Sequence, residues 1–230
     1  MESFEAAFQM LGSLKLANKY QVDGLRNDIV EQLSSGWPRH LSEWDEMDVR
    51  LGKNCPMSPD TPSIIRLARD GDIPELLPLS FYMLSRSFSN DVQGWEATPP
   101  SATGVQSSHK LFLLDRDDMA TLAFGQGGMA RWISSRTGSK FREWVCPNRL
   151  IPCQDRVRVR WAEIQNDILH SMDILTVLKM YASGKSPAGT SLCVACQTLF
   201  VQALLGIRND FFDELPKIFG LRESSSASYH

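Results

Sequence analysis

The stretch SPDTPSIIRLARDGDIPELLPLSFYMLSRS, residues 58–87, carries the clearest structural signals in the chain. Thr61 followed by Pro62 is typical of a helix start, because proline is favoured in the first turn, where its missing N–H has no helical partner. Gly71 is typical of a helix end. These residues predict a first helix over positions 61–71.

A second helix is expected directly after the first. Asp72 and Glu75 have the spacing of a capping box, in which each side chain bonds the backbone N–H of the other residue. Pro78 either restarts or kinks this helix, and the apolar residues beyond it are expected to pack in a core. Residues 58–87 therefore predict a helical hairpin.

Apolar residues at helical intervals extend this interpretation toward the amino terminus. They predict two helices between residues 2 and about 34, and Ser42 is a candidate cap for a third. Trp37, Leu41 and Trp44 are expected in the core. The recurring apolar positions of the first two helices are Phe4, Phe8, Leu11, Leu14, Leu16, Val22, Leu25, Ile29, Val30 and Leu33.

Two further helices are expected in the carboxyl-terminal half. One runs from Arg116 to about Phe124, is broken at GQGG (125–128) and resumes through Ile133. The last runs from about Val194 to Leu215. The apolar stripe of this last helix is expected to include Leu199, Ala203, Ile207 and Phe211.

The segment RVRVRWAEIQNDILH, residues 156–170, has two patterns at once. Alternation of valine and arginine fits a strand, whereas the spacing of Val157, Trp161 and Ile164 fits a helix. We favour the helix because its pattern is sustained longer. A strand would align Arg156, Arg158 and Arg160 on one face, and a helix separates them, so these arginines are expected to be solvated. The four basic positions available to a nucleic acid are Arg149, Arg156, Arg158 and Arg160.

Composition and charge exclude several classes of protein. Apolar residues make up 43% of the 230 residues and charged residues 22%, which are ordinary values for a globular protein. The formal charge of −3 gives no strong field for nucleic acid or anionic lipid, so neither is an expected partner. No run approaches the roughly 18 apolar residues of a spanning helix, and no secretory signal opens the chain. We expect an intracellular protein, nuclear or cytoplasmic.

Four of the five cysteines form two pairs, Cys146 with Cys153 and Cys193 with Cys196. Intracellular thiols stay reduced, and the C-x2-C spacing of the second pair lets two sulfurs face one ion. A helix start at the second pair favours thiolate. The pattern predicts a structural zinc bound by all four residues. Cys55 is expected to be a loop thiol rather than a ligand, and His170 a surface residue near a helix end.

Two other interpretations of the cysteines stay open. The thiols can be buried small hydrophobic groups, or Cys193 and Cys196 can form a redox pair. No βαβ pattern surrounds the second pair, as a thioredoxin-like site requires.

No catalytic signature is complete. GKS at 184–186 lacks the upstream glycine of a phosphate-binding loop, and GQGG lacks the dinucleotide-binding spacing. The acids Asp115, Asp117 and Asp118 are explained as the negative start of a helix. The sequence therefore predicts a protein that is not an enzyme.

Six phrases in order resemble one family. They are LANKYQVDGLRNDIVEQL (16–33), WPRHLSEWDEMD (37–48), IIRLARDGDIPELLPLSFYMLS (64–85), the pair Cys146 and Cys153, LCVACQ (192–197) and DELPKIFGL (213–221). Together they resemble the part of fungal BTB/POZ-domain proteins that follows the β-sheet core. The first phrase looks like the closing BTB helices, and the later phrases look like the helical carboxyl-terminal extension.

The resemblance implies a function and a domain order. It implies a truncated family member without the BTB core, acting as a non-catalytic protein-interaction module or adaptor, with self-association or ubiquitin-ligase components as partners. It also implies the paired cysteines at 146, 153, 193 and 196. We expect a mainly α, irregular helical domain with long loops and a small zinc-stapled subdomain. Its parts are 1–86 (BTB-like helices), 87–110 (flexible insertion), 111–221 (helices and cysteines) and 222–230 (disordered tail).

Two functions of other classes stay open. A zinc-containing, nucleic-acid-associated regulator would present the arginines near the cysteines and lose affinity steeply with salt. A thiol oxidoreductase would use Cys193 and Cys196.

Overall fold

The protein is built from helices. The computed structural model describes residues 13–14, 16–51, 61–92, 111, 113–148, 153–184 and 192–221, and no strand occurs among them. The expectation of a mainly α fold is confirmed. Within these residues no helix is both long enough and apolar enough to cross a membrane.

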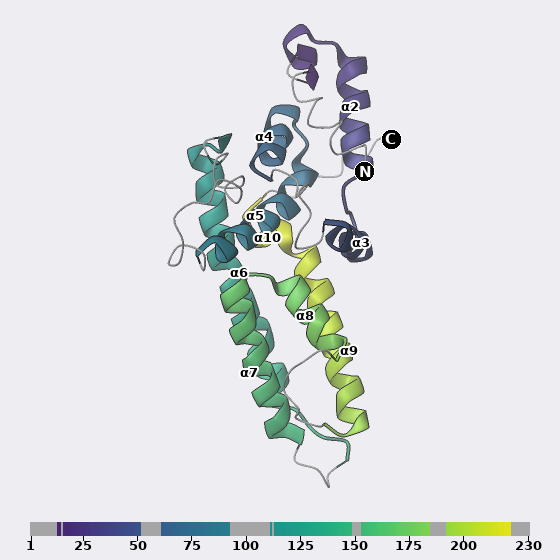
Figure 1. Ribbon diagram of the computed structural model, residues 1–230, viewed down its shortest axis with the longest axis vertical. Coiled ribbons are helices and arrows are strands. Elements are labelled where there is room, and N and C mark those ends of the chain that lie inside the picture. Colours follow the sequence, from purple (N-terminus) through teal and green to yellow (C-terminus); the bar gives the residue numbers. More distant parts are fainter. Residues whose placement is uncertain are drawn as a thin grey trace, which may run out of the picture.

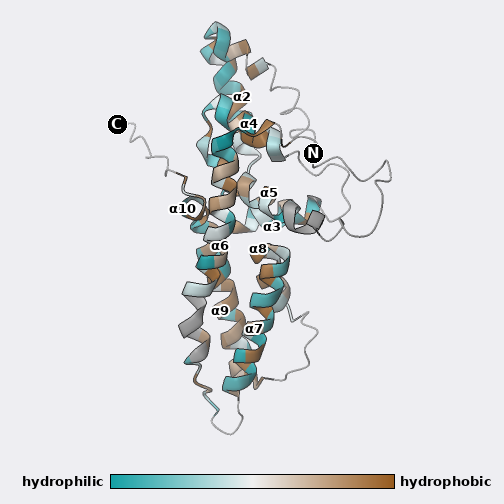
Figure 2. Cartoon of the chain, turned by 90° about the vertical axis from the view of Figure 1, so that its left-hand side faces the viewer, coloured by the Kyte–Doolittle hydropathy of each residue, from teal (hydrophilic) through white to brown (hydrophobic). Residues whose placement is uncertain are grey.

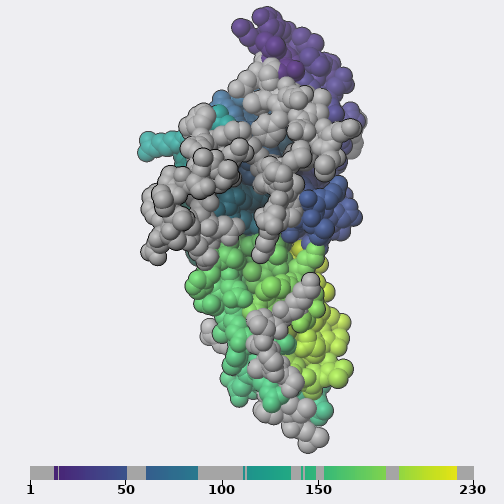
Figure 3. All heavy atoms as spheres, in the orientation of Figure 1, coloured from purple at the N-terminus to yellow at the C-terminus, as the bar shows by residue number. Residues whose placement is uncertain are grey.

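The molecule is elongated, with two parts stacked along its long axis (Figure 1). Helices α2 to α5 and the start of α6 form the upper part, and α6 to α9 form a column below it, whose surface Figure 3 shows in green to yellow. Residues 13–14 and 16–20 are also helical. The elements are α2 (Asp23–Ser35), α3 (Leu41–Leu51), α4 (Thr61–Gly71), η1 (Pro74–Leu76), α5 (Leu77–Val92), α6 (Arg116–Arg142), α7 (Cys153–Ser171), α8 (Ile174–Ala182), α9 (Val194–Asp213) and α10 (Leu215–Ile218).

The upper part and the column differ in hydropathy. Helix α2 is largely hydrophilic, whereas hydrophobic residues gather on the column helices, where α7, α8 and α9 face one another (Figure 2). One continuous set of buried side chains runs through both parts. The two parts therefore share a single core.

The helical hairpin at 58–87 is confirmed from Thr61 onward, with α4 ending at Gly71. The predicted capping box is wrong. Asp72 adopts a left-handed backbone conformation (φ 52°), and the N–H of Ile73 bonds the carbonyl of Ala68 at 2.9 Å, which closes α4 from its carboxyl end. Asp72 belongs to the carboxyl-terminal end of α4 and does not cap the next helix. Glu75 accepts a hydrogen bond from Ser34 and not from the backbone of Asp72. Helix α5 restarts at Leu77, with Pro78 in its first turn, and packs beside α4.

The amino-terminal helices match the prediction in part. Ile29 and Leu33 of α2 are buried, but Val22 and Leu25 are exposed. Trp37 and Trp44 lie in the core as expected, and Leu41 packs against it. Phe4, Phe8 and Leu11 lie outside the described residues.

The predicted cap of α3 is also wrong. Ser42 lies within the helix, and the carboxylate of Glu43 accepts the N–H groups of Arg39 at 2.7 Å and His40 at 3.3 Å. A carboxylate is a better acceptor than a hydroxyl at the positive end of a helix. The hydrogen bond from the Arg39 backbone lowers the pKa of Glu43.

The arginine-valine segment is helical, as favoured. Helix α7 buries Val157, Trp161, Ile164 and Ile168. In α9 the predicted apolar stripe is only half correct. Ile207 and Phe211 are buried, but Leu199 is exposed, because its neighbour Phe200 takes the buried position one residue later.

Helix α6 is continuous across GQGG, so the predicted break is wrong. The glycines are required for close packing of α10 instead. A Cβ atom at Gly125 would lie 1.9 Å from the Phe219 ring, and one at Gly128 would lie 2.6 Å from the carbonyl oxygen of Ile218. Packing that only glycine permits outweighs its low helix propensity.

Helix α5 continues to Val92, beyond the predicted start of the 87–110 insertion. Residues 93–110 of that insertion, and the predicted tail at 222–230, lie outside the described residues.

A buried arginine connects the two parts of the molecule. Arg208 of α9 is 4% exposed, and its guanidinium binds both carboxylate oxygens of Asp45 in α3 and the carbonyl oxygen of Leu175 in α8. Lys179 also contacts Asp45, at 2.8 Å. Burial acts to raise the pKa of Asp45, but the bonds from Arg208 and Lys179 outweigh it and hold the pKa below 3.8.

A second polar cluster lies beside the first. The hydroxyl of Tyr82 in α5 donates to Asp173 at 2.8 Å and accepts the N–H of Leu175 at 3.0 Å. Asp173 caps α8 and pairs with Arg86 at 2.8 Å. Burial raises the pKa of Tyr82 well above 10, so this hydroxyl keeps its proton. The start of α8 is thus anchored on α5.

We predict that Gly125→Ala lowers the free energy of unfolding by about 1–3 kcal/mol, because its methyl group collides with Phe219. The control is Gly127→Ala, where the new Cβ meets only the end of the Arg131 side chain at 3.7 Å. That change is expected to raise stability by about 0.5–1 kcal/mol. Urea unfolding of both variants measures the difference, and equal effects would contradict the packing role.

We predict that Arg208→Met destabilises the protein by about 3–5 kcal/mol, because Asp45 loses its buried partner. Arg50→Met, at an exposed pair with Glu46, should change stability by less than about 0.5 kcal/mol. Since the pKa of Asp45 is lowered by folding, the pairing contributes at higher pH and is lost as the pH falls through that lowered value. Urea titrations over a pH series should show a weaker acid dependence in Arg208→Met, where Lys179 is the remaining partner of Asp45.

Candidate metal centre

Three segments of chain bring the cysteines together at the lower end of the column. Cys153 is the first residue of α7, Cys193 directly precedes α9, and Cys196 lies in the first turn of α9. Cys146 lies in the segment after α6. The amino-terminal ends of α7 and α9 lie side by side in Figure 1, which explains how residues far apart in sequence meet.

The four sulfur atoms lie within 4.8 Å of one another. The sulfurs of Cys146 and Cys193 are 3.8 Å apart. A tetrahedral ion bound to sulfur at about 2.3 Å requires sulfur–sulfur distances of about 3.8 Å, whereas a disulfide requires about 2.05 Å. The four residues are free thiols, and their arrangement can hold a metal ion.

Helix register places two of the thiols in the core. Cys153 precedes Val157 and Trp161 by one and two turns, and all three are buried. Cys196 stands in the same relation to Phe200 and Leu204. Each cysteine therefore continues the buried stripe of its helix, while Cys146 and Cys193 are only half-buried. This periodicity is visible in the sequence once the helices are assigned.

Aromatic rings surround the thiols. Phe141 stacks on Trp161 at 4.5 Å between ring centres and meets Phe200 edge-on at 5.4 Å. Trp144 stacks on Phe141, and its indole N–H donates to the sulfur of Cys196 at 3.3 Å. A donor on a ligand sulfur stabilises negative charge there and orients the ligand. The sequence analysis missed Trp144, although its place two residues before Cys146 was a usable signal.

Neighbouring groups give the thiols different pKa values. The backbone N–H of Cys196 stabilises the Cys193 thiolate and lowers its pKa to about 7. Desolvation raises the pKa of Cys196, and desolvation together with contacts to the other sulfurs raises the pKa of Cys146 to about 12. Cys193 thus loses its proton more readily than Cys146 or Cys196. A divalent cation bound here would displace the thiol protons and stabilise the thiolates.

The remaining predicted residues lie apart from this cluster or have other partners. His170 is exposed at the far end of α7, about 25 Å along the helix from Cys153. Arg158 pairs with Asp155, and Arg160 donates to Gln197 of α9 at 2.8 Å. The arginines were expected to be solvated, and Arg158 is exposed, whereas Arg160 lies partly buried against α9. Cys55, Arg149 and residues 185–191 lie outside the described residues.

The acids at the start of α6 do more than complement the helix dipole. Asp115 accepts the N–H of Asp118 at 2.8 Å, as a helix cap does. Asp118 is 1% exposed and pairs with Arg69 of α4 at 3.0 Å. The explanation by dipole alone was incomplete, because Asp118 joins α6 to the hairpin.

In comparisons with known proteins, no family model, no curated protein and no solved structure matches the chain.

We predict that Trp144→Phe weakens binding of Co²⁺ by about 10-fold to 100-fold, because the Cys196 sulfur loses its indole donor. The matched control is Trp161→Phe in the same aromatic cluster, whose ring nitrogen has no hydrogen-bond partner among the described residues. The control should keep near wild-type affinity. Absorbance of thiolate-bound Co²⁺ during competition with a chelator gives both affinities, and equal losses would exclude the hydrogen bond as the cause.

Proposed function

We propose that the four-cysteine cluster binds a structural zinc ion and that the protein is a non-catalytic helical module for protein interaction. The observation that carries the zinc proposal is the convergence of four sulfurs within 4.8 Å from three separate segments. Four thiolates are soft ligands, which favour zinc over magnesium or calcium. With four protein ligands a tetrahedral ion has no open position for substrate, so the role is structural.

The zinc ion would join three separate segments of chain at this end of the column. Cys146 ties the end of α6 to the starts of α7 and α9, through Cys153 and the pair Cys193 and Cys196. Because such a site forms only in the folded chain, the free energy of metal binding adds to the stability of the fold. The bound ion would hold the end of α6 and the starts of α7 and α9 in the positions in which their aromatic rings pack together.

The interaction function rests on the resemblance to the carboxyl-terminal part of BTB/POZ proteins. The resemblance implies a helical architecture and paired cysteines, and the described residues have both. Other proteins are the proposed partners, through self-association or as components of a ubiquitin ligase. Reduced thiols at a zinc site suit an intracellular location, nuclear or cytoplasmic.

A thiol oxidoreductase is the second candidate. The lowered pKa of Cys193, about 7, and its position at the start of α9 are the observations that favour it. Insulin reduction by the wild-type chain, abolished in Cys193→Ser, would establish this activity. A zinc-bound protein without that activity supports the structural role instead.

We predict about one zinc per chain in protein purified under reducing conditions without chelator. Cys196→Ser should lose the metal, whereas Cys55→Ser should retain it, because the sequence predicts a loop thiol at Cys55 rather than a ligand. Metal analysis gives the zinc content, and far-UV circular dichroism during chelation should report local loss of helix. Protein that holds no metal, even after zinc titration, would contradict the structural-zinc proposal.

A further inference from the structure

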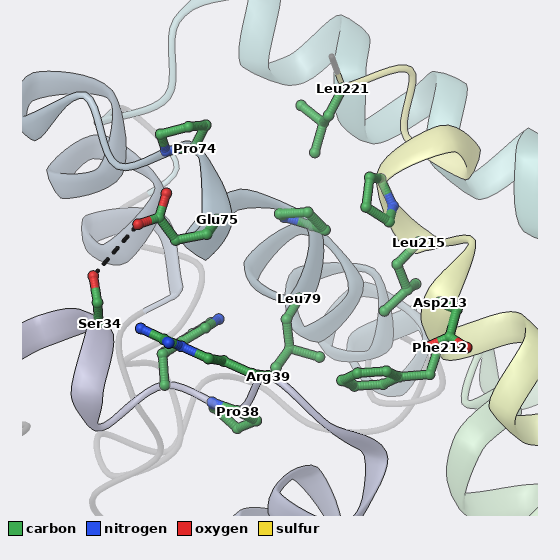
Figure 4. Close-up of a pocket in the computed structure, with 13 residues that line it drawn as sticks. Ser34, Pro38, Arg39, Pro74, Glu75, Leu79, Phe212, Asp213, Leu215 and Leu221 are labelled. Carbon is green, nitrogen blue, oxygen red and sulfur yellow. Dashed lines mark hydrogen bonds between the residues drawn. The ribbon is translucent and has the colours of Figure 1, made fainter. Parts of the chain in front are cut away.

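A groove lies at the other end of α9, about 24 Å along the helix from Cys196. It encloses about 400 Å³ and is formed by the α2–α3 connection, by η1 with the start of α5, and by the end of α9 with α10. Figure 4 shows its side chains converging from these separate segments. The groove is therefore a tertiary feature, distinct from the metal centre.

The floor of the groove is apolar. Leu79 and Leu215 are buried, and Phe212 and Leu221 are partly exposed beside them. All four line the groove, and in Figure 4 Leu79, Phe212 and Leu215 lie near one another with Leu221 above them. Such a floor favours an apolar side chain from a ligand, because burial of that group releases its hydration water.

Four prolines make the walls stiff. They come from three different segments of chain and fix the backbone dihedral φ at each position. A stiff wall loses little conformational freedom when a ligand binds, so less of the interaction free energy is spent on ordering the protein. The prolines are Pro38, Pro74, Pro78 and Pro216.

A second hollow of about 350 Å³ adjoins the first and shares Ser34, Trp37 and Arg39 with it. The two hollows carry unequal charge. The carboxylates of Glu31, Glu43, Glu75 and Asp213 stand against a single guanidinium, that of Arg39, which leaves three net negative charges.

Two of these carboxylates flank the apolar floor. Glu75 and Asp213 lie on opposite sides of Leu79 in Figure 4. Both carboxylates belong to exposed residues. A cation seated beside the floor would meet negative charge in either direction along the groove.

We propose that this groove binds a short peptide segment of a partner protein that carries an apolar side chain next to lysine or arginine. The apolar side chain packs on Leu79, Phe212 and Leu215, and the basic side chains pair with the carboxylates around them. Two adjoining hollows, one apolar and one acidic, require a ligand with both kinds of group along its length, as a peptide has. The inference goes beyond the proposed interaction function, because it names the surface and the chemistry of the partner.

Random dodecapeptides displayed on phage, selected against the full-length zinc-loaded chain, are the probe. We expect the selected peptides to share an aromatic or aliphatic residue within a few positions of lysine or arginine. Fluorescence anisotropy of the labelled peptides then gives their affinities. Peptides enriched in acidic residues, or a selection that yields no shared pattern, would overturn the proposal.

Charge reversal locates the binding site. Glu75→Lys and Asp213→Lys should each weaken the selected peptides by about tenfold, and the effect should shrink at about 1 M salt, where screening acts within about 3 Å. The matched control is Asp210→Lys, which adds the same charge to an exposed position of α9 that does not line the groove. Equal losses in Asp213→Lys and Asp210→Lys would overturn the proposed site.

Two further readouts separate this proposal from others. Zinc content should stay unchanged in all three variants. Loss of peptide binding would then not contradict the zinc proposal, and absence of zinc would not contradict the peptide proposal. Sedimentation of the full chain tests the alternative occupant, a second copy of the same protein. If Asp213→Lys dissociates a dimer and peptide binding is absent, the groove is a self-association surface and the peptide proposal is wrong.

Discussion

The buried guanidinium of Arg208 is the constraint that unites the structure. A charge removed from water must be paired and fully hydrogen-bonded, or folding loses several kcal/mol, on the order of 3–5. Arg208 meets this requirement only when α3, α8 and α9 lie together, because Asp45 and the Leu175 carbonyl come from different helices. The position of α3 against the column is thus defined by polar geometry as well as by the burial of Trp44.

Helix α9, which carries Arg208, also makes packing contacts at both of its ends. At its start, Cys196 and Phe200 face the thiols and rings contributed by α6 and α7. At its end, Phe211 packs on Tyr82 and Trp132, and the chain turns into α10 against the glycines of α6. The candidate metal centre and the groove therefore lie at opposite ends of one helix. A structural ion at one end and a partner at the other are compatible, because neither uses residues of the other.

Helical segments were predictable wherever apolar spacing persisted. Helices α7 and α9 were recognised from that spacing. The hairpin within residues 58–87 was recognised from Thr61, Pro62 and Gly71, and the possible metal site from the two cysteine pairs. The errors arose where a side chain had a choice of partners. Asp72 closes the helix before it instead of capping the one after it, and Glu43 takes the place expected for Ser42. Local sequence offers both options, and neighbouring packing selects between them.

The sequence by itself determined the helical class of this protein and the cysteine pairs that can bind a metal, because both follow from spacing along the chain. Only the tertiary structure decided that α6 passes unbroken through GQGG, since the benefit of those glycines lies in their contact with Phe219 and Ile218, about ninety residues away. The same is true of the Trp144 bond to Cys196 and of the groove beside Phe212. Such features depend on distances between segments, and no periodicity within one segment encodes them.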